Sequence, residues 1–375
     1  MINIFQNKLQ NNLEILYIVN SLELGGAEQI FFNILKNKKK ILIITLISEG
    51  YFGNKLKNRG FKLINLNMKK NIFIIFKFFR LIQIINKYKP EIVHTWLYHS
   101  NLIGGIASKL SGVKQIFWSI HHEFEYSNII MFIEMKILAF LSYLIPNKIV
   151  YCSYSSKQSH ILNGYNRKLS NIIENGISLE KFKPKRDLRI NLRKKLKIKK
   201  NCFLIGNISR YHPIKDHETL LKSLKILKKN KIFFKCILIG KGLSKSNVNL
   251  FNKIKEYNLE DNVILYGKSL KVHELLNAFD LNILSSKSEC SPVTLLEAMA
   301  SGVPSLSTNV GNAKNLIGNS GWIVESENPE ALASCISYIA NNRYKLAEKS
   351  KLGIKRVRSL YTREKMRLSY RALYT

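Results

Sequence analysis

The chain has 375 residues, 46% of them hydrophobic, and is therefore long enough for two domains with separate cores. Its 60 Lys and Arg against 25 Asp and Glu give a net charge of +35, an excess that favours polyanionic partners. The five cysteines are widely spaced and form no C-x-x-C motif, which argues against a disulfide framework and against a zinc site.

The first residues show no export signal. Residues 1–12 contain no apolar segment of the secretory type, and no run of 18 or more uncharged apolar residues occurs in the sequence. We therefore expect a cytoplasmic protein. Two stretches, residues 72–85 and 129–145, are strongly apolar but carry a few charges. They fit either a helix on a membrane surface or a helix that buries a wide apolar stripe.

Short apolar runs alternate with longer helical patterns in the first half of the chain. The expected strands are residues 14–20, 41–47, 61–66, 91–94, 115–119, 148–152 and 171–174. Helical patterns between them include residues 27–35, 71–88 and 102–110. This alternation predicts a first domain, residues 1–183, in which helices cover both faces of a parallel sheet.

A polar and basic stretch interrupts this alternation at residues 184–200, which predicts a linker. The expected strands then continue at residues 203–208, 234–239, 263–265, 281–284 and 304–307. Residues 201–360 are therefore expected to form a second doubly wound domain. Residues 361–375 are expected to form a last helix that can return to the first domain. The fold class is thus α/β, with two Rossmann-like domains whose ligand-binding strand ends face each other across a cleft.

The loop after the first expected strand contains Gly25 and Gly26. Paired glycines let the backbone approach a ligand closely, and the helix that begins there favours an anion. An ordinary turn explains the pair equally well.

Histidines follow two of the other expected strands. His121 and His122 come directly after residues 115–119, so at least one of them points toward the expected cleft. His121 is the better candidate for a sugar contact, and a structural role is the alternative. His94 and His99 flank another strand end, where they are candidates for contact with the acceptor.

In the second domain, Arg210 and Lys215 lie five residues apart in the loop after the first expected strand. They are well placed to converge on a diphosphate, because Arg grips phosphate oxygens in a bidentate way and Lys acts as a compact charge. Two unrelated surface cations are the alternative. Gly240, in a Gly-Lys-Gly turn after the next strand, is a weaker phosphate candidate because the full G-x-G-x-x-G pattern is missing.

The strongest local pattern is residues 288–304, which follow the expected strand 281–284. Ser291 suits the N-cap of a helix, Pro292 its first turn, and Gly302 the position after its end. The start of this helix, from Ser291 and Pro292 to Val293 and Thr294, is expected to face a phosphate group.

Two glutamates belong to the same pattern. Glu289 precedes the helix, and Glu297 lies on its second turn. Carboxylates accept hydrogen bonds from hydroxyl groups, so the pair suits a sugar and a ribose beside a bound phosphate. A capping acid and a solvated glutamate are the alternative. The sequence contains neither D-x-D nor G-x-x-x-x-G-K-[ST], so we expect no metal-clamped donor site, no P-loop and no cofactor.

Together these motifs resemble those of glycosyltransferase family 4, retaining enzymes of the GT-B type that often build bacterial surface polysaccharides. The resemblance covers most of the chain, and the E-x₇-E pair followed by EAMASG is its most specific part. The matching motifs, in the family's order, are LGGAE at 24–28, VHTW at 93–96, ENGI at 174–177, GNISR…KD at 206–216, LIGKG at 238–242, ECSPVTLLEAMASGVP at 289–304 and YTREKM…Y at 361–370.

The resemblance implies a retaining, metal-independent transfer of a hexose or N-acetylhexosamine. The donor would be a nucleotide-sugar, with UDP as the first choice, and the acceptor a growing lipid-linked glycan of a lipopolysaccharide or capsule. By the same resemblance Arg210 and Lys215 bind the diphosphate, Glu297 the ribose and Glu289 the donor sugar. At Cys290 the family more often has glycine, so the donor sugar is not copied from any relative.

In the first domain, the resemblance implies that Gly25 and Gly26 line the donor phosphate or the acceptor and that His121 contacts the transferred sugar. It also implies an acceptor at the inner face of the cell membrane, where the basic surface would dock as a peripheral protein. Solvated lysines in a biased composition explain the charge equally well.

Two other functions fit parts of the sequence. A nucleotide-sugar 2-epimerase would share the architecture and the donor, but the E-x₇-E element favours the transferase. A nucleic-acid-binding protein would show a clustered basic stripe with interleaved aromatic residues, whereas these cations are spread through both halves. We therefore expect no nucleic acid partner.

Overall fold

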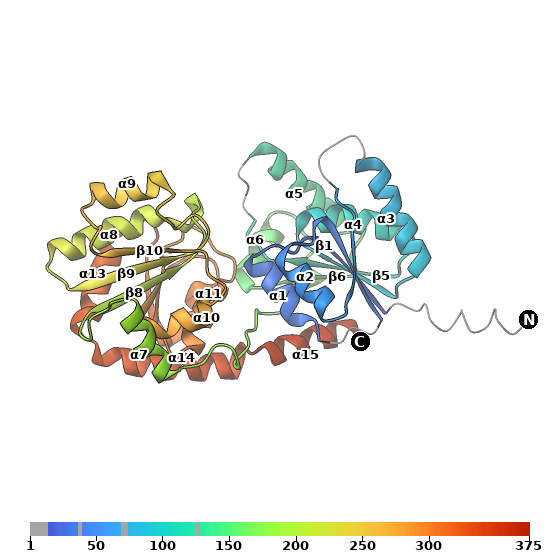
Figure 1. The fold of residues 1–375 in the computed structure, drawn as a ribbon. Helices are drawn as coiled ribbons and strands as arrows, with labels where there is room; N and C mark the ends of the chain where they lie inside the picture. The colour runs from blue at the N-terminus through green and yellow to red at the C-terminus, as the bar shows by residue number, and fades with distance from the viewer. Residues whose placement is uncertain (1–13, 37–39, 69–73, 125, 127) are drawn as a thin grey trace, which may run out of the picture. The chain divides into compact units, whose positions relative to one another are not determined.

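The computed structural model describes residues 14–36, 40–68, 74–124, 126 and 128–375. The chain divides into two compact units: Met1–Asn175 with Met366–Thr375, and Gly176–Lys365. Each unit contains one parallel sheet with helices on both faces (Figure 1), which confirms the predicted α/β fold class. The first twelve residues, on which the export prediction rests, lie outside the described part.

The first unit is built on a seven-stranded sheet. Its strands are β1 (Ile15–Ser21), β2 (Ile41–Ser48), β3 (Lys62–Asn65), β4 (Ile92–Trp96), β5 (Gln115–Ile120), β6 (Lys148–Tyr151) and β7 (Ser170–Ile172). Its helices are α1 (Gly26–Ile34), α2 (Gly50–Asn58), α3 (Ile74–Tyr88), α4 (Tyr98–Leu110), α5 (Ile129–Leu141) and α6 (Tyr154–Leu162), together with most of α15 (Arg363–Tyr374). The strand order is β3-β2-β1-β4-β5-β6-β7.

Alternate residues of these strands face two separate layers. Leu16 and Ile18 of β1 pack in one buried cluster with Leu81 and Ile85 of α3. Tyr17, between them, contacts the ring of Phe31 on α1 instead. Because both faces are covered, the central strands β1 and β2 are apolar and buried over most of their length. Figure 1 shows α3, α4 and α5 on one side of this sheet, and α1 and α15 on the other.

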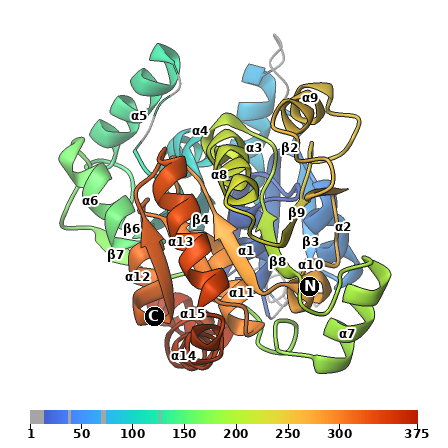
Figure 2. The same ribbon diagram turned by 90° about the vertical axis from the view of Figure 1, so that its left-hand side faces the viewer.

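The second unit is built on a six-stranded sheet. Its strands are β8 (Phe203–Ile208), β9 (Phe234–Ile239), β10 (Val263–Gly267), β11 (Leu281–Leu284), β12 (Ser305–Thr308) and β13 (Gly321–Val324). Its α-helices are α7 (Arg186–Lys195), α8 (His217–Lys229), α9 (Val248–Glu256), α10 (Val272–Leu275), α11 (Val293–Ala300), α12 (Ala313–Ile317), α13 (Pro329–Asn341) and α14 (Tyr344–Leu360). The strand order is β10-β9-β8-β11-β12-β13, and Figures 1 and 2 show α8 and α9 above this sheet and α14 below it.

Two features of the second unit differ from the sequence prediction. The polar stretch predicted as a linker contains α7, because Arg189 and Arg193 lie one turn apart and both reach the carboxylate of Asp280. The strand β13 was missed; it begins with glycine, and all four of its residues are only partly buried.

Two helices of the first unit begin at residues other than those predicted from the sequence. The helix predicted at residues 71–88 is described from Ile74, and residues 71–73 lie outside the described part. α4 begins four residues earlier than predicted, directly after Leu97, whose φ of 74° turns the chain out of β4. In the described residues, no helix is long and apolar enough to cross a membrane.

Candidate functional site

The predicted donor loops of the second unit lie next to one another. Backbone hydrogen bonds join the loop after β8 to the loop after β9, from Ser209 N to Ile239 O (3.1 Å) and from Tyr211 N to Lys241 O (2.8 Å). The loop after β11 is bonded to the same segment, since the Ser285 hydroxyl donates to Lys215 O (3.1 Å). These loops follow neighbouring strands, so their side chains gather at one edge of the sheet.

Lys215 and Glu289 form an ion pair at this edge. The Nζ atom of Lys215 lies 2.5 Å from Oε1 of Glu289, and the hydroxyl of Ser286 donates to the same oxygen at 2.7 Å. The side chains are 20% and 11% exposed, so water screens the pair only in part. The structure therefore brings together a predicted diphosphate cation and a predicted sugar-binding carboxylate.

Arg210 lies at the beginning of the same loop and is exposed. Burial lowers the pKa of His212, and the positive charges of Arg210 and Lys215 lower it further. Both predicted cations therefore act on one neighbouring side chain, as expected for a positively charged loop.

The helix of the strongest motif is α11, and its beginning differs from the prediction in one residue. Pro292, not Ser291, occupies the N-cap position, and Val293 is the first helical residue. Pro292 has an extended backbone (ψ 104°), so it lies outside the helical conformation that begins at Val293. The N–H groups of Val293 and Thr294 belong to the first turn, which has no intrahelical acceptors for them.

The remaining residues of the motif follow the prediction. Glu297 lies on the second turn of α11 and is buried. Gly302 follows the C-cap Ser301 with a φ of +76°, the left-handed conformation expected after a helix end. The motif is thus a strand, a loop and a helix, with one carboxylate in the loop and one on the helix.

Two glycines keep these loops close together. At Gly240, with φ +154°, a Cβ would lie 1.7 Å from the carbonyl oxygen of Ser209. At Gly311, a Cβ would lie 1.6 Å from the carbonyl oxygen of Glu289. Gly240 therefore has a packing role, and its predicted phosphate contact stays a prediction. Gly311 was missed because its neighbour, Glu289, is 22 residues away in the sequence.

Gly25 and Gly26 begin α1 in the first unit. Gly25 is the N-cap residue, and a Cβ there would meet the carboxylate of Glu28 at 2.1 Å. A Cβ on Gly26 would meet no described atom within 4 Å. The Glu28 carboxylate already supplies a negative charge at this helix terminus, so a bound phosphate would compete with it.

His121 follows β5 and is 8% exposed. Its ring stacks on Trp96, with 4.4 Å between the ring centres and 25° between the planes. Neither ring nitrogen has a hydrogen-bond partner among the residues that the structure describes. Burial lowers its pKa to about 3, so the ring is neutral at pH 7. A buried histidine without partners requires an explanation, and a ligand is one.

The other candidate histidines have different surroundings. His94 is fully buried, with Nδ1 2.7 Å from the hydroxyl of Tyr374 and Nε2 2.8 Å from that of Ser119. Because both ring nitrogens are bonded within the protein, His94 is a structural residue and not the acceptor contact considered for it. The side chain of His99 is 60% exposed and lies 3.6 Å from Glu134.

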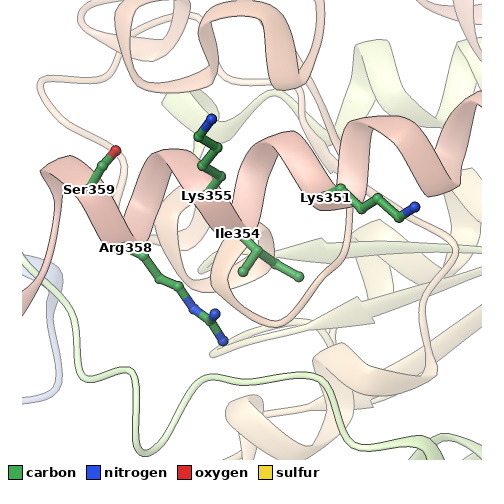
Figure 3. Close-up of a pocket in the computed structure, with 5 residues that line it drawn as sticks. All are labelled: Lys351, Ile354, Lys355, Arg358 and Ser359. Atoms are coloured by element: carbon green, nitrogen blue, oxygen red, sulfur yellow. The ribbon is translucent and has the colours of Figure 1, made fainter.

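Elsewhere on the second unit, a shallow hollow lies along α14. Figure 3 shows the residues that line it, which are Lys351, Ile354, Lys355, Arg358 and Ser359. None of the predicted site residues is among them. In the described part of the chain, no group of three or more His, Cys, Asp or Glu residues is placed to hold a metal ion.

Four buried histidines predict that acid destabilises the fold. Burial lowers the pKa of His94 and His121 to about 3, and that of His160 and His217 to about 4. The unfolded chain therefore binds protons first as the pH falls below about 6.5, and each histidine weakens folding by roughly 1.4 kcal/mol per pH unit. Thermal unfolding midpoints are expected to fall steadily from pH 7 to pH 5. A constant midpoint in that range would contradict the burial of these histidines.

Comparisons with known families cover most of the chain. Residues 37–181 match the family described as Glycosyltransferase Family 4, and residues 189–356 match the family described as Glycosyl transferases group 1. The first match spans much of the first unit, and the second spans the Lys215–Glu289 pair and α11.

Individual relatives agree with these matches. EpsF of Bacillus subtilis is 30% identical over 173 residues, which are 45% of this chain and 44% of EpsF. The UDP-Gal:alpha-D-GlcNAc-diphosphoundecaprenol alpha-1,3-galactosyltransferase of Escherichia coli is 23% identical over 289 residues, 74% of this chain and 73% of that enzyme. This chain thus matches less than half the length of EpsF and about three quarters of the galactosyltransferase.

Solved structures share the fold. HepE of Anabaena, in complex with UDP-glucose, has a TM-score of 0.86 and 20% identity over 96% of this chain and 98% of HepE. At this identity the likeness establishes the fold, and the two parallel sheets described above are its common feature.

Proposed function

Because the chain belongs to glycosyltransferase family 4, we propose that it transfers a hexose or an N-acetylhexosamine from a nucleotide-sugar to a growing cell-surface glycan. UDP is the first choice of nucleotide, and a lipid-linked saccharide is the first choice of acceptor. The name of the Escherichia coli relative supports both choices, and the UDP-glucose complex of HepE supports the first. The observation that carries the proposal is the Lys215–Glu289 pair in the loops beside α11.

The donor diphosphate is proposed to bind between these loops and the beginning of α11. Negative charge grows on the diphosphate as its bond to the sugar breaks, and fixed positive groups lower the energy of that state. Lys215 has three N–H donors, so it can hold Glu289 with one and phosphate oxygens with the others. Arg210 and the first-turn N–H groups of α11 would supply the remaining contacts.

The two carboxylates are proposed to hold hydroxyl groups of the donor. Oε1 of Glu289 accepts from Lys215 and Ser286, which fixes the carboxylate, and Oε2 would accept from a sugar hydroxyl. Glu297, buried on α11, would accept from the ribose. In the first unit, His121 would donate to or accept from the transferred sugar, and Gly25 and Gly26 would line the phosphate or acceptor side.

The proposed transfer retains the configuration of the sugar. The bond between the anomeric carbon and the diphosphate oxygen breaks, and the acceptor oxygen forms the new bond on the same face of the ring. A phosphate oxygen of the leaving nucleotide takes the proton of the acceptor hydroxyl. Positive side chains stabilise the leaving group in this scheme, which uses no metal ion and no cofactor.

We further propose that the first unit binds the inner face of the cell membrane, where a lipid-linked acceptor would lie. α5 has an outer row of exposed apolar side chains: Ile129, Ile130, Ile133, Ile137 and Phe140. α3, on the same side of the sheet (Figure 1), adds Phe76 and Phe79, which are 70% and 56% exposed. Exposed apolar rows on a protein of net charge +35 suit a surface of anionic lipids.

A double substitution on α5 tests this surface. Ile130→Asp with Ile133→Asp is expected to weaken binding to anionic vesicles at least about tenfold, because two exposed isoleucines that would enter the membrane surface are lost and two negative charges are gained. Vesicle sedimentation at low salt measures the effect. The control is Leu162→Asp on α6. Leu162 is 83% exposed, and its substitution should change vesicle binding little. The membrane proposal would be refuted if the wild-type protein did not bind anionic vesicles.

The transferase proposal is tested with purified protein and a panel of UDP- and GDP-sugars. Release of nucleoside diphosphate is followed with and without membrane lipid extract, first without added metal. We expect one donor to give lipid-stimulated release. Interconversion of a UDP-sugar with its epimer, without release, would instead support the 2-epimerase, which the family matches do not favour.

A further inference from the structure

The C-terminal helix α15 is anchored to the helix that carries the glycine pair. The guanidinium group of Arg367 donates to the carbonyl oxygens of Asn33 (2.6 Å) and Leu35 (3.1 Å) at the C-terminal end of α1. A cation at this end satisfies carbonyl groups that lack helical partners and complements the helix dipole. Figure 1 shows α15 beneath α1.

The last turn of α15 reaches the middle of the sheet. The hydroxyl of Tyr374 lies 2.7 Å from Nδ1 of His94 and 2.9 Å from the hydroxyl of Tyr17. Its ring stacks parallel to Phe117, at 5.9 Å and an interplanar angle of 4°. Hence α15 is bonded to both β1 and β4 and packs on β5.

One turn earlier, Tyr370 begins a series of rings that ends at His121. Tyr370 is 2% exposed, and its ring centre lies 5.9 Å from that of Trp96. Trp96 is 1% exposed, and its ring centre lies 4.4 Å from that of His121. A tightly packed ring cannot move without displacing its neighbours, so the position of Tyr370 affects that of His121.

Packing is the main constraint on the orientation of His121. Histidines in active sites are usually oriented by a hydrogen bond to one ring nitrogen. Neither ring nitrogen of His121 has such a bond in the part of the chain that the structure describes. The plane of the imidazole is therefore set by the face of Trp96 beneath it.

We propose that Tyr370 is a positioning residue for His121: α15 holds Trp96 in place, and Trp96 orients the imidazole toward the sugar. The contact between the imidazole and a sugar rests on the proposed function. The ring series itself rests on the geometry alone. It also gives the last ten residues of the chain, which are remote in sequence from the site, a part in the reaction.

The test compares three full-length variants. Tyr370→Ala removes the ring, Tyr370→Phe keeps it, and Leu373→Ala removes another buried side chain of α15 that has no ring contact with Trp96. All are studied with ¹³Cε1-labelled histidine, and the His121 signal is identified by its loss in His121→Asn. Sugar transfer and stoichiometric binding of UDP are measured on the same samples.

We expect Tyr370→Ala to shift or broaden the His121 signal and to lower kcat about tenfold, because a small misplacement of a contact group slows the reaction. UDP should bind with wild-type affinity and stoichiometry, and Tyr370→Phe should behave as wild type. An unchanged His121 signal in Tyr370→Ala, or an equal loss of kcat in Leu373→Ala, would overturn the proposal. If wild-type protein transfers no sugar, the proposed function fails, and the His121 signal still decides the positioning.

Discussion

Replacing Lys215 with alanine is expected to lower kcat for sugar transfer by about 10²- to 10³-fold, the usual cost of removing one group that stabilises charge in the transition state. The substitution removes a partly buried cation from the proposed leaving diphosphate. It also leaves the carboxylate of Glu289, now 2.5 Å from Lys215 Nζ, without its counter-charge. That negative charge would then repel the phosphates.

Lys287 provides the matched control. It lies in the loop after β11, but its side chain is 43% exposed and pairs with Glu327. Lys287→Ala removes the same formal charge from the same loop region and should leave kcat within about twofold, because exposed pairs contribute little. Steady-state kinetics with saturating acceptor compares the two variants. Equal losses of kcat in the two variants would mean that only the overall positive potential of these loops contributes to transfer.

The second large effect concerns stability. Asp280→Ala is expected to lower the free energy of unfolding of the second unit by about 3 kcal/mol, since removing one partner of a largely buried ion pair leaves the Arg193 charge uncompensated. Asp280 accepts from Arg189 at 2.5 Å, from Arg193 at 3.1 Å and from the backbone N–H of Leu204 at 2.7 Å. Arg193 is 8% exposed and would remain buried without a carboxylate.

Urea unfolding, followed by circular dichroism, measures this loss. Asp187→Ala is the control, because Asp187 is an exposed residue in the first turn of α7. It should change the free energy of unfolding by less than about 1 kcal/mol, as surface substitutions usually do. A loss below about 1 kcal/mol in Asp280→Ala would mean that α7 is attached mainly by its apolar contacts.

The sequence predicted the parts of the site that depend on local rules. Lys215 and Glu289 are 74 residues apart, yet both follow strands, and parallel-sheet topology puts the carboxyl ends of β8 and β11 side by side. The helix after Glu289 and its glycine end could also be recognised, because caps and turns use few residue types. Within this helix the predicted N-cap residue was wrong by one position.

Other features depend on contacts that local patterns do not show. α7 was predicted as a linker because its arginines look solvated until Asp280, about 90 residues later, is placed beside them. His94 and His121 look alike in sequence, but Tyr374, 280 residues after His94, bonds only the former. Gly311 likewise shows its role only when the loop of Glu289 is packed against it.

Transfer of a labelled sugar tests the central claim most directly. Purified protein is incubated with radiolabelled UDP-sugars and membrane lipid extract, and label in the lipid fraction is counted for wild type, Lys215→Ala and Lys287→Ala. The proposed function predicts that one donor labels the lipid fraction, that Lys215→Ala loses nearly all of this label, and that Lys287→Ala keeps it. No lipid label from any UDP- or GDP-sugar, or equal label with Lys215→Ala, would contradict it.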